Sequence, residues 1–240
     1  MKLYAIGCSF THGHQLNGPT GGWPQIVADK LNATLTNYGC SGAGNTYISR
    51  HLQINLIKPD LALVMWSGLT RKDVLIDHTY RPLVSALNNY SYIAPATDTT
   101  SYLFSGGMRG SWENNNLTKE IFNPLYKISN ERTMAEETLL NILQLQSYFK
   151  LHNIKYIMSS YVNYWNNQER VADLDFGIKQ FADLLHLVDQ IDFSCWVFTK
   201  EHDCIYELAQ RTPNGLQPDK FHPTYIVHEQ WANLVLKTLE

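Results

Sequence analysis

The segment KLYAIGCSFTHG (residues 2–13) contains a short apolar run that stops at a glycine and continues into small and polar residues. A continuous run from Leu3 to Ile6 is typical of a buried strand in a parallel sheet that is covered on both faces. Gly7 allows the backbone to turn sharply there because it has no Cβ. Ser9 is therefore expected directly after the first strand.

The alternation of apolar strands and amphipathic helices continues along the chain. Further strands are predicted at 33–38, 61–66, 155–160 and 193–198. Helices are predicted from Trp23, over 47–57, 132–152 and 171–188, and from about Thr224 onward. Strands that alternate with helices indicate a parallel sheet with right-handed crossovers. The prediction is an α/β fold with a mostly parallel five-stranded sheet.

One domain over residues 1–240 is expected, because no repeat or linker interrupts this pattern, and 44% hydrophobic residues suffice for a large core. Residues 85–130 differ from the rest: they are rich in Tyr, Asn, Ser, Thr and Gly, without a sustained period. They are predicted to form a long irregular insertion. Its aromatic side chains suit either stacking on sugars or packing against the sheet: Tyr90, Tyr92, Tyr102, Phe104, Trp112 and Tyr126.

Composition argues against several classes of protein. The net charge is −3 and no run of Lys or Arg occurs, so nucleic acid is not an expected partner. No apolar run approaches the roughly 18–20 residues that span a bilayer, and the first residues do not resemble a signal peptide, which favours a cytoplasmic protein. The four cysteines lack CxxC spacing, so we expect neither a metal nor a disulfide framework, and no cofactor. Nothing in the sequence specifies the number of subunits.

Three loops are expected to meet at the carboxyl edge of the sheet, where open α/β sheets bind ligands. They contain Ser9, the glycine-rich stretch 39–45, and Ser67. Asp219 and His222 precede the last predicted helix, and with Ser9 they provide the hydroxyl, imidazole and carboxylate needed for acyl transfer. The simpler alternative is a turn serine, a capping aspartate and a surface histidine.

Two weaker patterns near these loops are given structural interpretations. The pair His12 and His14 could bind a metal, but two histidines without a carboxylate are more often exposed side chains. The loop at 39–45 could hold a phosphate, but it lacks both the dinucleotide motif and the P-loop lysine.

At these residues the chain resembles the SGNH (GDSL-type) hydrolases. GCSFTHG (7–13) is similar to the first block of that family, with Cys8 in place of the usual aspartate. NYGCSG (37–42) is similar to the second block and DKFHP (219–223) to the last. The resemblance implies a flavodoxin-like three-layer α/β/α sandwich. It also implies Ser9 as nucleophile, His222 as base, Asp219 as its partner, and the backbone N–H groups of Ser9 and Gly42 as oxyanion donors.

The third block departs from the family, which has Gly-x-Asn-Asp where this chain reads MWSGLTR (65–71). The asparagine that would donate to the oxyanion is absent. Ser67 is our first choice as a substitute, and the alternatives are Gly68, Thr70, Arg71 and Asn45. A further alternative is that the N–H groups of Ser9 and Gly42 suffice without a third donor. The candidate substrate-binding residues are Asn45, Trp66, Arg71 and Trp112.

The predicted function is a serine esterase that removes a small acyl group, such as acetyl, from a carbohydrate or a similar polar ester. A long-chain lipase is less favoured because the insertion shows no long apolar lid helix. The alternative is a non-catalytic glycan-binding module on the same scaffold, which the missing asparagine favours. The segment at Trp66 and Ser67 resembles phage members of the family, so a virion-associated or assembly-associated location is the second expectation beside the cytoplasm.

Overall fold

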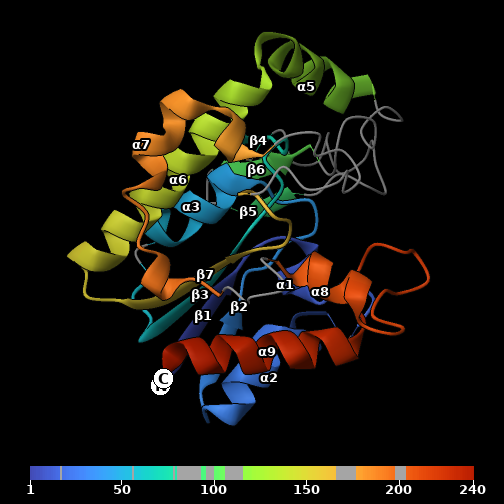
Figure 1. Cartoon of the computed structure of the whole chain (residues 1–240). Coiled ribbons are helices and arrows are strands. Elements are labelled where there is room, and N and C mark those ends of the chain that lie inside the picture. The colour runs from blue at the N-terminus through green and yellow to red at the C-terminus, as the bar shows by residue number, and fades with distance from the viewer. Residues whose placement is uncertain are drawn as a thin grey trace.

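The computed structural model describes residues 1–16, 18–55, 57–77, 79, 93–95, 100–105, 116–165, 177–197 and 204–240. Its central sheet has the strand order β2-β1-β3-β7, and all neighbouring strands are parallel (Figure 1). The strands are β1 (Lys2–Ile6), β2 (Thr34–Asn37), β3 (Leu61–Trp66) and β7 (Lys155–Ser160). The order reverses at β1, so the sheet has a topological switch point there.

Helices cover both faces of this sheet. On one face lie α2 (Trp23–Lys30) and α9 (Tyr225–Leu239), and on the other lie α3 (Asn45–Ile54) and α6 (Glu131–Leu151), as Figure 1 shows. The predicted three-layer α/β/α architecture is confirmed. No helix in the described ranges combines the length and apolar character needed to cross a membrane.

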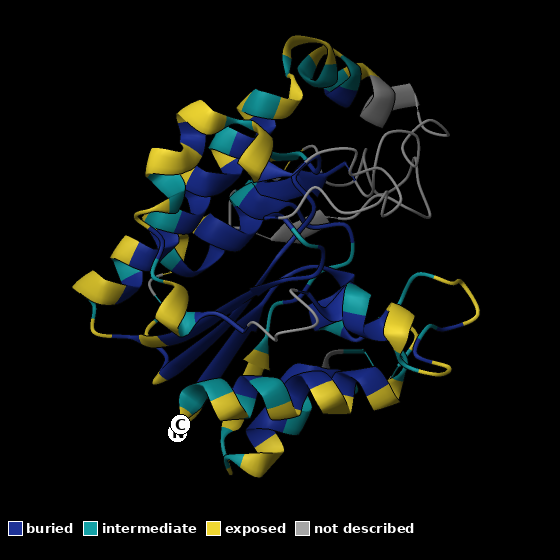
Figure 2. Ribbon diagram, in the orientation of Figure 1, coloured by how far each residue is buried: buried dark blue, intermediate teal, exposed yellow. Residues whose placement is uncertain are grey.

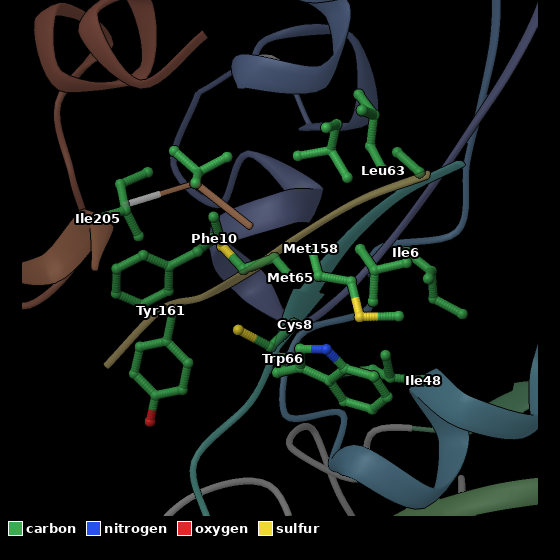
Figure 3. Close-up of a cluster of buried hydrophobic side chains, with 14 of the residues drawn as sticks. Ile6, Cys8, Phe10, Ile48, Leu63, Met65, Trp66, Met158, Tyr161 and Ile205 are labelled. Atoms are coloured by element: carbon green, nitrogen blue, oxygen red, sulfur yellow. The ribbon is translucent and has the colours of Figure 1, made fainter. Parts of the chain in front are cut away.

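Burial explains why the strand predictions succeed. Every residue of β3 is buried, as expected for a central parallel strand between two helical layers (Figure 2). At the carboxyl end of the sheet, Cys8, Phe10 and Trp66 join strand residues in one apolar cluster (Figure 3). The first turn after β1 therefore packs against the hydrophobic core.

The predicted fifth strand at 193–198 is wrong over its described residues. Phe193–Cys195 forms a 3₁₀ turn, and only Trp196 pairs with the sheet, through an isolated parallel bridge to Met158. Asp192 explains the difference, because its side chain accepts a hydrogen bond from Ser194 Oγ at 2.5 Å and so favours a turn. Within the described residues the parallel sheet has four strands.

The predicted helix over 171–188 is also wrong in its described part. Residues 178–184 form two 3₁₀ turns, and only α7 (Leu185–Val188) is α-helical. The buried side chains of Ile178 and Leu184 are six residues apart, a spacing that suits two turns of three residues. Between these turns Phe181, with φ of −103° and ψ of 83°, lies outside the helical region and prevents a continuous helix.

The insertion contains regular structure that the sequence pattern does not predict. Strands β6 (Thr100–Phe104) and β5 (Ile93–Pro95) of the insertion form a small antiparallel sheet with β4 (Asp73–Asp77), which precedes the insertion in the chain. Helix α5 covers Asn116–Ile128, with Phe122 buried beside Leu103. Tyr102 and Phe104 are buried, so these two rings pack the insertion instead of facing a sugar. Tyr90, Tyr92 and Trp112 lie outside the described residues.

Candidate active site

Ser9 lies at the carboxyl end of β1, where it is the first residue of the short helix α1 (Ser9–His12). This helix approaches the end of β3 so closely that only glycine fits at position 7. A Cβ on Gly7 would lie 2.2 Å from Thr11 Oγ1 and 2.8 Å from the carbonyl oxygen of Met65. The close approach fixes the backbone just before Ser9.

The loop after β2 is held against α1 by a set of polar contacts. Asn37 Oδ1 accepts a hydrogen bond from Gly39 N at 2.8 Å, and its Nδ2 donates to the carbonyl of Thr11 at 2.9 Å. His12 Nδ1 contacts the Gly39 carbonyl at 3.0 Å, and Cys40 N donates to the Gly7 carbonyl at 3.0 Å. The first two loops of the site are therefore linked at fixed register.

The structure brings together three of the predicted residues from opposite ends of the chain. Ser9 Oγ lies 2.9 Å from His222 Nε2, and His222 Nδ1 lies 2.5 Å from Asp219 Oδ2. An ionised carboxylate can only accept, so the network assigns the proton to Nδ1 and leaves Nε2 to accept from the serine hydroxyl. This order of atoms is the one required for a serine nucleophile activated by a base.

The Asp219 carboxylate is positioned by the turn that carries it. Its Oδ1 accepts from the backbone N–H groups of Phe221 and His222, each at 2.9 Å. Lys220, between Asp219 and Phe221, adopts a left-handed φ of 60°.

Two glutamines hold this turn against the loop after α1. Gln15 Nε2 donates to Asp219 Oδ2 at 3.1 Å, and Gln217 Nε2 donates to the carbonyls of Pro223 at 2.8 Å and His14 at 3.1 Å. These two glutamines were missed from the sequence because neutral amides form no motif of their own.

The surroundings of His222 set the protonation states of the pair. Burial lowers the pKa of His222 below its ordinary value, against the opposing effect of Asp219, and His14 and Arg71 lower it further. For Asp219, burial raises the pKa, but hydrogen bonds from the His222 side chain and from backbone N–H groups outweigh it and leave a lowered value. Near neutral pH the imidazole is neutral and the carboxylate is ionised, as a general base and its orienting partner require.

Two backbone donors are available beside Ser9. The first N–H groups of a helix have no acceptor inside it, and the described hydrogen bonds give Ser9 N–H none. Gly42 is buried, and within the described part of the chain its N–H is also unused. Its φ of 82° is in the left-handed region, which explains the glycine. These are the two donors that the family resemblance implies.

In the third block, the backbone N–H of Ser67, our first choice as the third oxyanion donor, already has an acceptor. Ser67 N donates to Asn45 Oδ1 at 2.7 Å, and the Ser67 carbonyl accepts from Tyr164 OH and from Asn45 Nδ2. Asn45 Nδ2 also donates to Thr138 Oγ1 at 3.1 Å. The backbone N–H of Ser67 is therefore occupied, which leaves only its buried hydroxyl, and the Asn45 amide ties α3 to β3 and α6.

The other predicted residues fall in different environments. Trp66 is fully buried in the core and presents no surface to a substrate, so its assignment as a substrate-binding residue is wrong. Trp112 lies outside the described residues. No cluster of three His, Cys, Asp or Glu side chains that could hold a metal ion occurs among the described residues. His14 instead packs on His222, with ring centroids 4.4 Å apart.

Comparison with known proteins shows the fold. No protein-family model matches the sequence, and no curated protein matches it. Among solved structures, TesA has a TM-score of 0.52 at 10% identity, covering 100% of this chain and 98% of that chain. The acetyl xylan esterase AlAXEase has a TM-score of 0.52 at 12% identity, with 100% of both chains covered. The esterase EstA from Pseudoalteromonas has a TM-score of 0.51 at 11% identity, covering 99% and 96%. The fold is that of the SGNH-type hydrolases.

Proposed function

We propose that this protein is an SGNH-type serine esterase acting on a small acyl ester. The observation that carries the proposal is the hydrogen-bonded series from Ser9 Oγ through His222 to Asp219, with distances of 2.9 and 2.5 Å. A serine hydroxyl is a weak nucleophile until a base takes its proton, and the imidazole is within the distance that this transfer needs.

The proposed reaction proceeds in two half-reactions. His222 Nε2 takes the proton of Ser9 while Oγ attacks the ester carbonyl, which gives a tetrahedral oxyanion facing the N–H groups of Ser9 and Gly42. The imidazolium returns that proton to the departing alcohol, and the acyl group remains on Ser9. Water then attacks the acyl-enzyme with the same base, releasing the acid and restoring the serine.

The substrate class is an acetyl or similarly short ester carried by a carbohydrate. Two of the solved structures of the same fold are described as esterases, and one of them is an acetyl xylan esterase. We place the catalytic set on one domain spanning residues 1–240.

The test measures hydrolysis of p-nitrophenyl esters from acetate to octanoate, together with acetate release from acetylated xylan. Turnover should be highest for acetate, should disappear in Ser9→Ala, and should fall by two or more orders of magnitude in His222→Gln. Equal rates for wild type and Ser9→Ala would refute the proposed function.

A non-catalytic glycan-binding module is the second candidate, and the missing third-block asparagine favours it. It predicts binding of xylan oligosaccharides by calorimetry without any Ser9-dependent hydrolysis. Saturable binding together with Ser9-dependent acetate release would decide for the enzyme, because a pure binding module has no use for an activated serine.

A further inference from the structure

Arg71 is a buried cation that forms no salt bridge among the described residues, although the Asp73 carboxylate is near enough to interact with it electrostatically. Its side chain is 7% exposed, and no ion pair includes it within the described ranges. The adjacent Lys72 pairs with Glu137, and the Asp73 carboxylate accepts from the backbone N–H groups of Gly44 and Tyr47. Buried charges normally form a salt bridge, so a buried Arg71 without one needs an explanation.

The guanidinium lies between the two loops that carry the proposed oxyanion donors. Nη1 donates to the carbonyl of Ala43, the residue after Gly42, at 3.4 Å. Cys8, the residue before Ser9, is a side-chain neighbour of the group. The guanidinium carbon lies 5.0 Å from the ring centroid of Tyr161, which supports the cation from one side.

Most of the donor capacity of Arg71 is unused. Nε is buried without an acceptor, and within the described residues the guanidinium bonds only to the Ala43 carbonyl and the Cys8 side chain. Its charge reaches the site, since it lowers the pKa of His222. Burial tends to lower the pKa of Arg71, but Tyr161, Cys8 and the Asp73 carboxylate hold it above its ordinary value, so the side chain stays protonated.

We propose that Arg71 is the third oxyanion donor and replaces the asparagine that the family has in its third block. The proposal rests on the proposed esterase function. A guanidinium N–H would donate to the negative oxygen of the tetrahedral intermediate, and no proton would be transferred from it. Such a charge-assisted bond is roughly twice as strong as a neutral one, and it gains strength where water is excluded.

The test compares Arg71→Met, which removes donors and charge at similar volume, with Ser67→Ala and Thr70→Val. The hydroxyls of Ser67 and Thr70 are also buried without partners, so these variants test the competing donors. Arg71→Met should lower kcat for p-nitrophenyl acetate about 10²- to 10³-fold with little change in KM. The other two should stay within about threefold of wild type. Circular dichroism and thermal unfolding check that each variant is folded.

A transition-state analogue separates catalysis from structural support. A methyl trifluoromethyl ketone adds to the serine and places its oxygen in the oxyanion site, so Arg71→Met should weaken its inhibition by the same factor as kcat/KM. Arg71→Gln is the second variant, which keeps an amide but not the charge. Arg71→Gln should lose at least tenfold in kcat. If Arg71→Met does not fold, this measurement tests the role of Arg71 in its place.

The outcomes distinguish this proposal from the proposed function. Ser9-dependent hydrolysis by the wild type, together with unchanged kcat in the folded Arg71 variants, would overturn the role of Arg71 alone. A loss confined to KM would overturn it too, because that would indicate an anchor for the ground state of the substrate. A wild type without any Ser9-dependent hydrolysis would overturn both proposals.

Discussion

At the scale of single residues, the site depends on how a few neighbouring side chains set the pKa of the His222 imidazole. His222 contacts the carboxylate of Asp219 on one side and the hydroxyl of Ser9 on the other. The rings of Phe10 and Phe221 lie 5.4 and 5.2 Å from it, and His14 lies at 4.4 Å. Burial among these rings keeps the base neutral to a lower pH than an exposed histidine.

The pH dependence of kcat/KM follows from this environment. A lowered pKa means that His222 is protonated only below its ordinary value of 6.5, so the acidic limb of the profile should lie below pH 6.5. His14→Gln removes a group that lowers the pKa, and the limb should move to higher pH. His186→Gln, at an exposed histidine, is the control and should leave the limb in place. A His14 variant with an unshifted limb would contradict this account of the tuning.

At the scale of elements, the turn from β1 into α1 depends on the missing Cβ of Gly7. Gly7→Ala would bring a methyl group 2.2 Å from Thr11 Oγ1 and 2.8 Å from the Met65 carbonyl. We expect about 1–3 kcal/mol lower free energy of unfolding in urea, and a large loss of esterase activity because Ser9 moves.

A double variant checks the cause of that loss. Thr11 Oγ1 is buried without a partner, so Thr11→Ala alone should cost little. Gly7→Ala/Thr11→Ala removes the contact with Thr11 Oγ1 at 2.2 Å, keeps those with the Met65 carbonyl at 2.8 Å and the Cβ of residue 11 at 2.9 Å, and should recover part of the stability and activity. If the double variant is no better than Gly7→Ala, the contact with Thr11 is not the cause.

The elements also show how far the sequence predicts this structure. Continuous apolar runs such as 61–66 identify the parallel strands, because burial on both faces requires them. The helix predicted at 132–152 is Glu131–Leu151 in the structure, one residue earlier at each end, and Asn130 and Thr133 form the capping box at its start. The pattern fails at Ile178 and Leu184, where apolar residues fit 3₁₀ turns as well as a helix.

Within the site, motifs predict the proposed catalytic residues but not the residues that position them. Ser9, Asp219 and His222 are found because their types and order resemble a family. Gln15 and Gln217 depend on contacts between opposite ends of the chain, which no local pattern contains. Trp66 follows a strand like a site residue, yet its side chain turns into the core.

At the scale of the whole molecule, the site is assembled by packing of segments near both ends of the chain. Helices α2 and α9 lie together on one face of the sheet, and Trp23 N donates to His228 Nδ1 at 3.1 Å between them (Figure 1). Because α9 begins shortly after His222, this contact also fixes the segment that carries the proposed base.

The contact predicts acid sensitivity of the fold. Burial lowers the pKa of His228 to about 3, so the unfolded chain binds a proton between about pH 6.5 and 3 that the folded chain does not. The stability is complete above pH 6.5 and is lost as the pH falls, by up to about 1.4 kcal/mol per pH unit. His228→Gln stays neutral and can still accept from Trp23, so its unfolding free energy should decline less between pH 7 and 5.

Urea unfolding at both pH values measures this effect, with His186→Gln as the matched control at an exposed histidine. The control should follow the wild-type decline. Buried His51, with its pKa lowered to about 4, should maintain part of the decline in every variant. If the unfolding free energies of wild type and His228→Gln decline equally between pH 7 and 5, His228 is not the cause of the acid sensitivity.

The most direct test of the central claim is mass spectrometry of the protein after reaction with a fluorophosphonate, which bonds only to an activated serine. We predict one adduct on the peptide that contains Ser9, absent in Ser9→Ala and formed much more slowly in His222→Gln. No adduct on the wild type, or an adduct that persists in Ser9→Ala, would contradict the assignment of Ser9, His222 and Asp219 as a catalytic set.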